Sequence, residues 1–270
     1  MRIGQYTVED LLQVMQRLRD PEGGCPWDLQ QDFRSIVPST LEECYELAEA
    51  IEHGDYPHVA EELGDVLFQV VFYARLGEEQ GLFSFPDIVH NLVDKLLRRH
   101  PHVFAGGDME GVVADSVDVA EVKRSWEAIK RDERAARAQG GVLDDVPLAL
   151  PALPRAQKLQ KRAALVGFDW PDIAGVLEKL DEERRELRDA MASGADAAIA
   201  DEMGDLLFTC VNLARHLGLD AEAVLRQASG KFEQRFRTME TLAAAAGSAD
   251  LRALTATELD AFWRAAKASR

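Results

Sequence analysis

Two pairs of carboxylates stand at helical spacing in the second half of the chain. Glu183 and Glu186 are three residues apart, as are Glu202 and Asp205, and residues three apart lie on one face of an α-helix. Each pair can therefore present oxygens from two side chains to one ion. Oxygen ligands without neighbouring cysteine or histidine suit Mg²⁺ or Mn²⁺ rather than zinc.

The segment between these pairs is suited to reversing the chain. Residues 192–196 contain Gly194 and are long enough only for a tight connection, which predicts two antiparallel helices whose carboxylate pairs face each other. Four carboxylates in one space repel unless a cation lies among them. Beyond Asp205 the helix is apolar on all sides from Leu206 to Ala214, which predicts that it is buried.

The same arrangement occurs earlier in the chain. LEECYELAEAI and EELGDVLFQVVFYAR resemble DEERRELRDAM and DEMGDLLFTCVNLAR, and each carboxylate recurs 140 residues later. A single Glu-x-x-Glu spacing usually marks a solvated helix face, but such a face has no reason to keep one geometry twice while its neighbours change. The carboxylates of the first copy are Glu42, Glu43, Glu46, Glu62 and Asp65.

Two of these acidic residues have a structural alternative. Ser39 or Thr40 followed by Glu42 or Glu43 has the spacing of a helix capping box. Capping does not account for the other carboxylates of the first copy.

Basic and aromatic residues follow each acidic hairpin at matching spacings. A Lys and an Arg one turn apart can clamp phosphate. A Trp and a Lys one turn apart can stack on a nucleobase and meet a phosphate, although such a Trp can equally dock its helix. These residues are Lys95, Arg99, Trp126 and Lys130 in the first copy and Lys231, Arg235, Trp263 and Lys267 in the second.

Length and periodicity predict an all-α protein with two helical units. The chain has 270 residues, enough for two units of about 130 residues each, and no segment alternates as a strand would. Glycines and prolines separate the halves. We expect a first unit at residues 1–138, a linker at 139–152 and a second unit at 153–270, with Asp169 capping the acidic helix.

Composition excludes several classes of function. A net charge of −17 disfavours binding to nucleic acid, which basic surfaces usually grip. No apolar run reaches the ~18 residues of a membrane span and the start is polar, which predicts a cytoplasmic protein. A carboxylate di-iron bundle requires Glu-x-x-His on two helices, a pattern that this sequence lacks.

In combination, these motifs resemble those of the all-α nucleoside triphosphate pyrophosphohydrolases. The tandem copy, with RLRDPEGGCPWD, RRHPHVF and VGFDW in place, is similar to the MazG family in particular. The resemblance implies Mg²⁺-dependent hydrolysis of NTPs and dNTPs to the monophosphate and pyrophosphate by a homodimer. It also implies that the second copy is the main catalytic centre, while the first is a second active site, a weaker one or a scaffold.

The resemblance further implies roles for individual residues. Glu182 would orient water, and Glu182 and Asp205 would also face the nucleotide, which Trp263 and Lys267 would help to bind. Lys231 and Arg235 would clamp the phosphates. The ion would be held by Glu183, Glu186, Glu202 and Asp205, with Glu43, Glu46, Glu62 and Asp65 as the corresponding ligands of the first copy. The corresponding nucleotide residues there are Glu42, Lys95, Arg99, Trp126 and Lys130.

Two alternatives stay open at this point. A base-specific enzyme of the same superfamily, such as a dUTP or phosphoribosyl-ATP pyrophosphohydrolase, would share the metal site and differ in its contacts to base and sugar. A non-catalytic helical nucleotide sensor would bind nucleotide and form no product.

Overall fold

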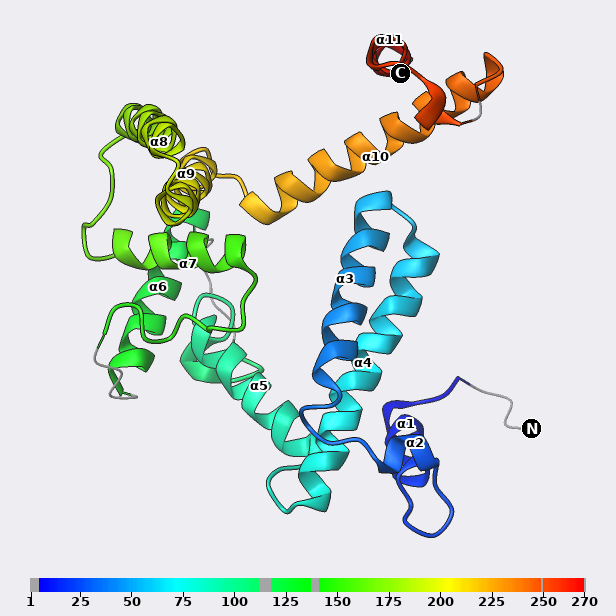
Figure 1. The fold of residues 1–270 in the computed structure, drawn as a ribbon. Helices are drawn as coiled ribbons and strands as arrows, with labels where there is room; N and C mark the ends of the chain where they lie inside the picture. The colour runs from blue at the N-terminus through cyan, green and yellow to red at the C-terminus, as the bar shows by residue number, and fades with distance from the viewer. Residues whose placement is uncertain (1–4, 112–117, 137–140, 249, 270) are drawn as a thin grey trace. The chain divides into compact units, whose positions relative to one another are not determined.

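The computed structural model describes residues 5–111, 118–136, 141–248 and 250–269. Every regular element within these ranges is helical (Figure 1), which confirms the all-α prediction. The chain divides into two compact units, Met1–Asp132 and Glu133–Arg270. This division lies a few residues before the predicted boundary at residue 138, and the predicted linker begins outside the described residues.

The first unit is built on a long helix, α4. Met15 of α1 packs with Ile36 and with Val71, Phe72 and Leu76 of α4 in a buried apolar cluster. The helices of this unit are α1 (Val8–Leu18), α2 (Pro26–Leu29), α3 (Val37–His53), α4 (Tyr56–Glu79), α5 (Phe85–Arg99), the 3-10 turn η1 (Ala105–Gly107) and most of α6 (Val119–Ala136).

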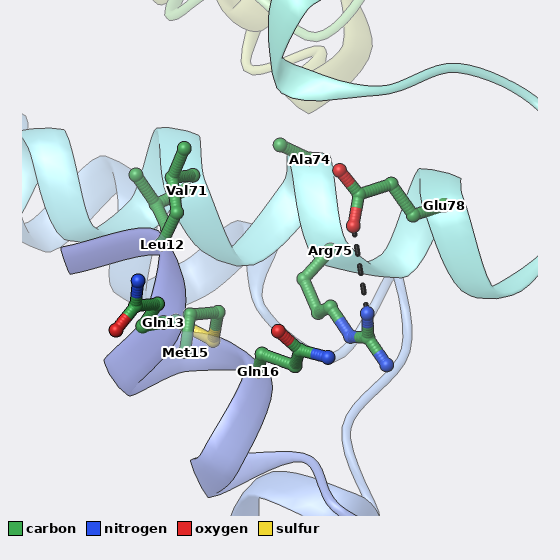
Figure 2. Close-up of a pocket in the computed structure, with 8 residues that line it drawn as sticks. All are labelled: Leu12, Gln13, Met15, Gln16, Val71, Ala74, Arg75 and Glu78. Carbon is green, nitrogen blue, oxygen red and sulfur yellow. Dashed lines mark hydrogen bonds and ion pairs between the residues drawn. The ribbon is translucent and has the colours of Figure 1, made fainter. Parts of the chain in front are cut away.

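A shallow cavity of about 170 Å³ lies between α1 and α4 (Figure 2). Leu12 and Val71 supply apolar walls, while Gln13 and the ion pair of Arg75 with Glu78, 3.5 Å between Nη1 and Oε2, lie at its rim. None of the carboxylates or basic residues predicted to form the site lines it. This cavity therefore lies apart from the predicted site residues, which the helical hairpins and the helices after them carry.

Each unit contains one antiparallel helical hairpin, as predicted. In the first unit α3 ends at Gly54, whose φ is 69°, and α4 follows at once. In the second unit α8 (Ile173–Ser193) ends at Gly194, with a φ of 70°, before α9 (Asp196–His216). A left-handed residue ends a helix with little strain only when it lacks a Cβ, so these two glycines, 140 residues apart, allow the same reversal.

The remaining helices of the second unit hold this hairpin at one end. α7 (Ala152–Ala164) packs on α9, where the amide of Gln160 donates to the carbonyl oxygen of Phe208 over 2.8 Å. Gln157 on the same helix donates to the carbonyl of Leu219, just before α10, over 2.9 Å. α10 (Ala221–Ala245) then runs away from the hairpin and carries η2 (Leu251–Ala253) and α11 (Ala256–Ala268) along its distal half (Figure 1).

The prediction that the helix after Asp205 is buried on all sides is wrong. Met203, Leu207 and Phe208 on α9 are 42%, 53% and 44% exposed. The apolar residues do surround the helix, but its main packing partners are α8 and α7, with a smaller contact to α10, and these leave part of its apolar surface exposed. Among the described helices, none has the length and hydropathy that a membrane span requires.

Both predicted helix caps are also wrong. α3 already begins at Val37, with Pro38 in its first turn, so the proposed capping box of Glu42 or Glu43 lies inside the helix. The N-cap of α8 is Asp172, whose carboxylate accepts from the backbone N–H of Gly175 over 3.1 Å. Asp169 instead pairs with Arg215, a partner too distant in sequence to be anticipated.

Candidate metal and nucleotide site

The hairpin of α8 and α9 brings three of the predicted carboxylates together. One oxygen from each of Glu183, Glu186 and Glu202 lies within 4.8 Å of the other two. Glu183 and Glu186 project from one face of α8, and Glu202 faces them from α9, as expected for antiparallel neighbours. Asp205, one turn further along α9, lies outside this group of three oxygens and is exposed.

The negative charges in this group of carboxylates repel one another. Partial burial raises the pKa of Glu202, and the charges of Glu186, Glu183, Asp201 and Asp205 raise it further. Each negative charge makes the next one less favourable. A divalent cation among these oxygens would remove that cost.

A lysine forms ion pairs with two carboxylates of the second copy. Lys179 lies one turn before the carboxylates on α8, with its Nζ 2.8 Å from an oxygen of Glu182 and 2.9 Å from one of Glu183. This pairing lowers the pKa of Glu182 and raises that of Lys179, chiefly through the hydrogen bonds between them. The lysine thus supplies one positive charge at the edge of the cluster.

Glu183 is the carboxylate best placed to bind an ion. Glu183 is only 3% exposed. Its carboxylate oxygen Oε2 is buried and has no hydrogen-bond partner among the described residues. A buried carboxylate oxygen without a partner carries a large desolvation cost. A set of ligands made of oxygens alone, one of them buried and unpaired, fits Mg²⁺ or Mn²⁺.

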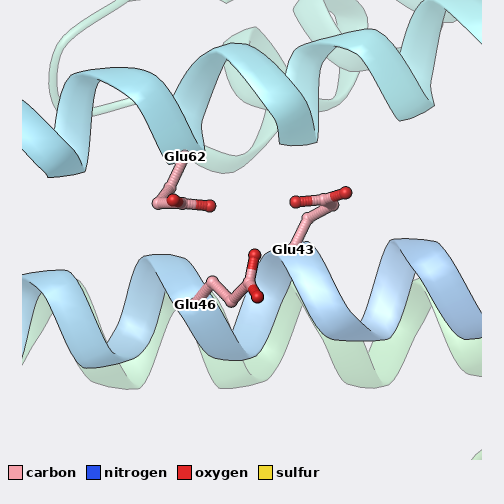
Figure 3. Close-up of side chains that lie close together, drawn as sticks. All are labelled: Glu43, Glu46 and Glu62. Atoms are coloured by element: carbon pink, nitrogen blue, oxygen red, sulfur yellow. The ribbon is translucent and has the colours of Figure 1, made fainter.

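The first copy has the same geometry. Glu43 and Glu46 on α3 and Glu62 on α4 each place an oxygen within 4.8 Å of the others (Figure 3). Burial and then the charge of Asp65 raise the pKa of Glu43, followed by the charges of its other acidic neighbours. Glu62 is 6% exposed, and its Oε2 likewise has no partner in the described structure.

The two copies differ in the nitrogen-bearing side chain that touches the cluster. In the first copy His58 of α4 places Nε2 2.7 Å from Oε1 of Glu62, whereas position 198, its counterpart, is Ala198. The counterpart of Lys179 is Ser39. Sequence reasoning missed both Lys179 and His58, although each stands four residues before its glutamate, the spacing at which helical side chains meet.

The predicted phosphate clamp of the second copy lies on another helix. Lys231 and Arg235 project from α10, the first exposed and the second half-buried. Neither forms an ion pair with a carboxylate of α8 or α9 within the described part of this unit. Near them, Lys267 of α11 lies with Nζ 5.4 Å from the ring centroid of Trp263. The structure therefore groups the clamp with the Trp-Lys pair and separates both from the carboxylates of the same chain.

The corresponding residues of the first copy lie on α5 and α6. Lys95 and Arg99 are half-buried on α5. Trp126 of α6 meets His100 edge to face, with ring centroids 5.1 Å apart. The side chain of Lys130 and residues 112–117 lie outside the described structure.

Comparison with known proteins agrees with this geometry. The family model described as the MazG nucleotide pyrophosphohydrolase domain matches residues 31–104 and 173–239, which include the carboxylates of both hairpins. A nucleoside triphosphate pyrophosphohydrolase of Escherichia coli strain K12 is 52% identical over 244 residues, 89% of each chain. The nucleoside triphosphate pyrophosphohydrolase/pyrophosphatase MazG of Thermotoga maritima is 43% identical over 267 residues, 99% of this chain and 98% of the relative.

Proposed function

The chain belongs to the MazG family of nucleoside triphosphate pyrophosphohydrolases, and from that premise we propose that Glu183, Glu186 and Glu202 hold a divalent cation required for hydrolysis. The observation that carries this proposal is the buried, unpartnered Oε2 of Glu183 beside two further carboxylates within 4.8 Å. Asp205, on the same helix as Glu202, completes the acidic set. The substrates are NTPs and dNTPs, and the products are the monophosphate and pyrophosphate.

Bound Mg²⁺ or Mn²⁺ supplies charge neutralisation and polarises the phosphoryl group. The residues of this chain do the rest. Glu182, held 2.8 Å from Lys179, keeps its charge and can accept a hydrogen bond from the attacking water, orienting it. Lys231 and Arg235, one turn apart, bind oxygens of the phosphate chain. Trp263 and Lys267 bind the nucleoside end of the substrate.

Charge supports the second copy as the main catalytic centre. The helix that carries Glu43 and Glu46, α3, contains no lysine or arginine, whereas α8 carries four basic residues among its acids. A triphosphate approaching α3 would therefore meet nearly uncompensated negative charge. The first copy, with Glu43, Glu46, Glu62 and Asp65, has the geometry to hold an ion and a weaker affinity for the anionic substrate.

We propose that the enzyme acts as a homodimer whose sites are completed between chains. The exposed apolar face of α9, which includes Met203, Leu207 and Phe208, is of the kind that a second subunit covers. The separation of Lys231 and Arg235 from the carboxylates of their own chain supports the same arrangement. In it, the clamp of one subunit would serve the carboxylates of the other.

Product analysis tests the proposed reaction. Purified protein is incubated with ATP and Mg²⁺, and the products are separated by ion-exchange chromatography, with an EDTA-treated sample as the control. We expect AMP and pyrophosphate in the presence of Mg²⁺ and neither after metal removal. Formation of ADP and phosphate would contradict the reaction, and recovery of intact ATP would favour a nucleotide sensor.

A further inference from the structure

α10 carries two exposed aromatic residues, each directly after one cation of the clamp. In the segment KFEQRF, Phe232 follows Lys231 and Phe236 follows Arg235. Phe232 is 58% exposed. Its ring stacks on that of Phe236, with centroids 5.9 Å apart, and lies 5.3 Å from that of Trp263 on α11. Phe232, Phe236 and Trp263 therefore form one aromatic cluster.

Docking of α11 does not account for the exposure of Phe232. α10 packs against α11, and Met239 and Ala243 of α10 and Ala266 of α11 are each at most 4% exposed without any part from Phe232. A phenylalanine ring that is more than half exposed to water lacks most of the hydrophobic free energy that full burial would provide. A ligand that covers this ring would recover part of it.

Positive charge surrounds the aromatic cluster. Lys231 and Arg235 flank Phe232 along α10, and Lys267 lies over Trp263. The nearby Glu233 forms an ion pair with Arg237. A flat apolar ring bordered by three cations is complementary to a ligand that joins a planar heterocycle to a chain of phosphates.

The first copy keeps the clamp and has no counterpart of the pair of phenylalanines. Its segment KLLRRH has Lys95 and Arg99 at the same spacing, but Leu96 and His100 stand where Phe232 and Phe236 stand in the second copy. The cations are thus repeated, and the two phenylalanines that follow them occur at these positions in the second copy alone.

We infer that the ring of Phe232, backed by Phe236 and Trp263, is the surface on which the nucleobase of the substrate stacks. This inference rests on the proposed function and deepens it, because stacking senses the area of a base and not the pattern of its edges. The enzyme therefore accepts all NTPs and binds purines more tightly than pyrimidines.

Binding of the two reaction products separates the base from the phosphates. AMP and pyrophosphate are each titrated calorimetrically into the full-length protein with Mg²⁺, for the unchanged chain and for Phe232→Leu, which introduces the residue of the first copy. We expect the dissociation constant of AMP to rise about tenfold, equal to about 1.4 kcal/mol. That of pyrophosphate stays unchanged, and the advantage of AMP over CMP shrinks.

A matched control and a size measurement complete the test. Phe168→Leu makes the same substitution at a ring that is 81% exposed, in the loop between α7 and α8, and should leave both constants unchanged. An equal loss for AMP and pyrophosphate in Phe232→Leu, or no loss for either, would overturn the inference. So would dissociation of the Phe232→Leu protein into smaller species in analytical ultracentrifugation, since the ring would then be a subunit contact.

Failure of the proposed reaction would be seen separately. Binding of AMP requires no turnover, so a protein that leaves ATP intact can still show the expected difference between AMP and pyrophosphate. Conversely, normal hydrolysis with an unchanged AMP constant in Phe232→Leu overturns the stacking surface alone.

Discussion

Replacing Glu183 with glutamine removes one negative charge from the second-copy cluster and nearly preserves the shape of the side chain. If this carboxylate serves mainly to bind an ion, its loss has little effect on the metal-free protein. If it serves mainly as a buried structural ion pair with Lys179, its loss strands a charge and is costly. The two roles therefore predict different stabilities.

The expected magnitude follows from the neighbouring charges. Two carboxylates with oxygens within 4.8 Å repel Glu183, and Lys179 attracts it across 2.9 Å. At the effective dielectric constant of about 20 that suits a buried group, the attraction is about 6 kcal/mol and each of the two repulsions is about 3.5 kcal/mol, so they largely cancel. Lys179 is 32% exposed and keeps its contact with Glu182. We expect Glu183→Gln to change the free energy of unfolding without metal by less than about 1 kcal/mol.

The effect of metal should be large by comparison. Mg²⁺ at 100 times its dissociation constant stabilises the unchanged protein by about 2.7 kcal/mol, which corresponds to several degrees in Tm. In Glu183→Gln only the first copy can still hold the ion, so this shift in Tm should shrink. Its kcat/KM for ATP should fall about a thousandfold, as when a principal electrostatic partner of the transition state is lost. Thermal denaturation with and without Mg²⁺, together with steady-state pyrophosphate release, measures both quantities.

Two results would refute this reasoning. A loss of about 3–5 kcal/mol in the absence of metal is the size expected for a broken buried ion pair, and it would make Glu183 a structural residue. A Tm that still rises normally with Mg²⁺ in Glu183→Gln would place the ion elsewhere. Circular dichroism at 25 °C serves as the control that the helices are intact.

Three further predictions concern the dimer, the neighbouring lysine and the effect of pH. Mixed dimers of inactive Lys231→Met and inactive Glu183→Gln should regain about a quarter of the normal activity if sites form between chains, and none if each site forms within one chain. Lys179→Met removes a competing cation, so the apparent Mg²⁺ constant from Tm titration should tighten about fivefold; a weaker constant would mean that the lysine helps to position the ligand. Hydrogen bonds from Arg215 lower the pKa of Asp169 from 3.8 to about 2, so this carboxylate stabilises the fold above about pH 4 and loses its effect between pH 4 and 2. Asp169→Asn should therefore cost about 2 kcal/mol at pH 7 in urea unfolding, with a gap that narrows on acidification; a gap independent of pH would contradict this account.

The chain's helical spacing and internal repetition made much of the site predictable. Carboxylates three residues apart share a helix face whatever the fold, because 3.6 residues make one turn. Gly54 and Gly194 indicated the reversals because only a residue without a Cβ takes a positive φ with little strain. The hairpins, and the meeting of Glu183 with Glu186 and Glu202, follow from these local rules.

Other features depended on packing between residues far apart in sequence. Asp169 has the spacing of a helix cap and is instead bound by Arg215, forty-six residues later, which the fold brings to it. The exposed face of α9 was likewise hidden from sequence reasoning, since apolar residues on every side of a helix do not tell how many neighbours cover it.

By itself, then, the sequence determined the helical class, the two hairpins and the acidic residues that line them, because each is set by spacing within a few turns of chain. The tertiary structure alone decided that Phe232 lies exposed against Trp263 and that the clamp on α10 stands apart from the carboxylates of its own chain. These facts depend on the directions in which whole helices run, and local periodicity carries no information about those directions.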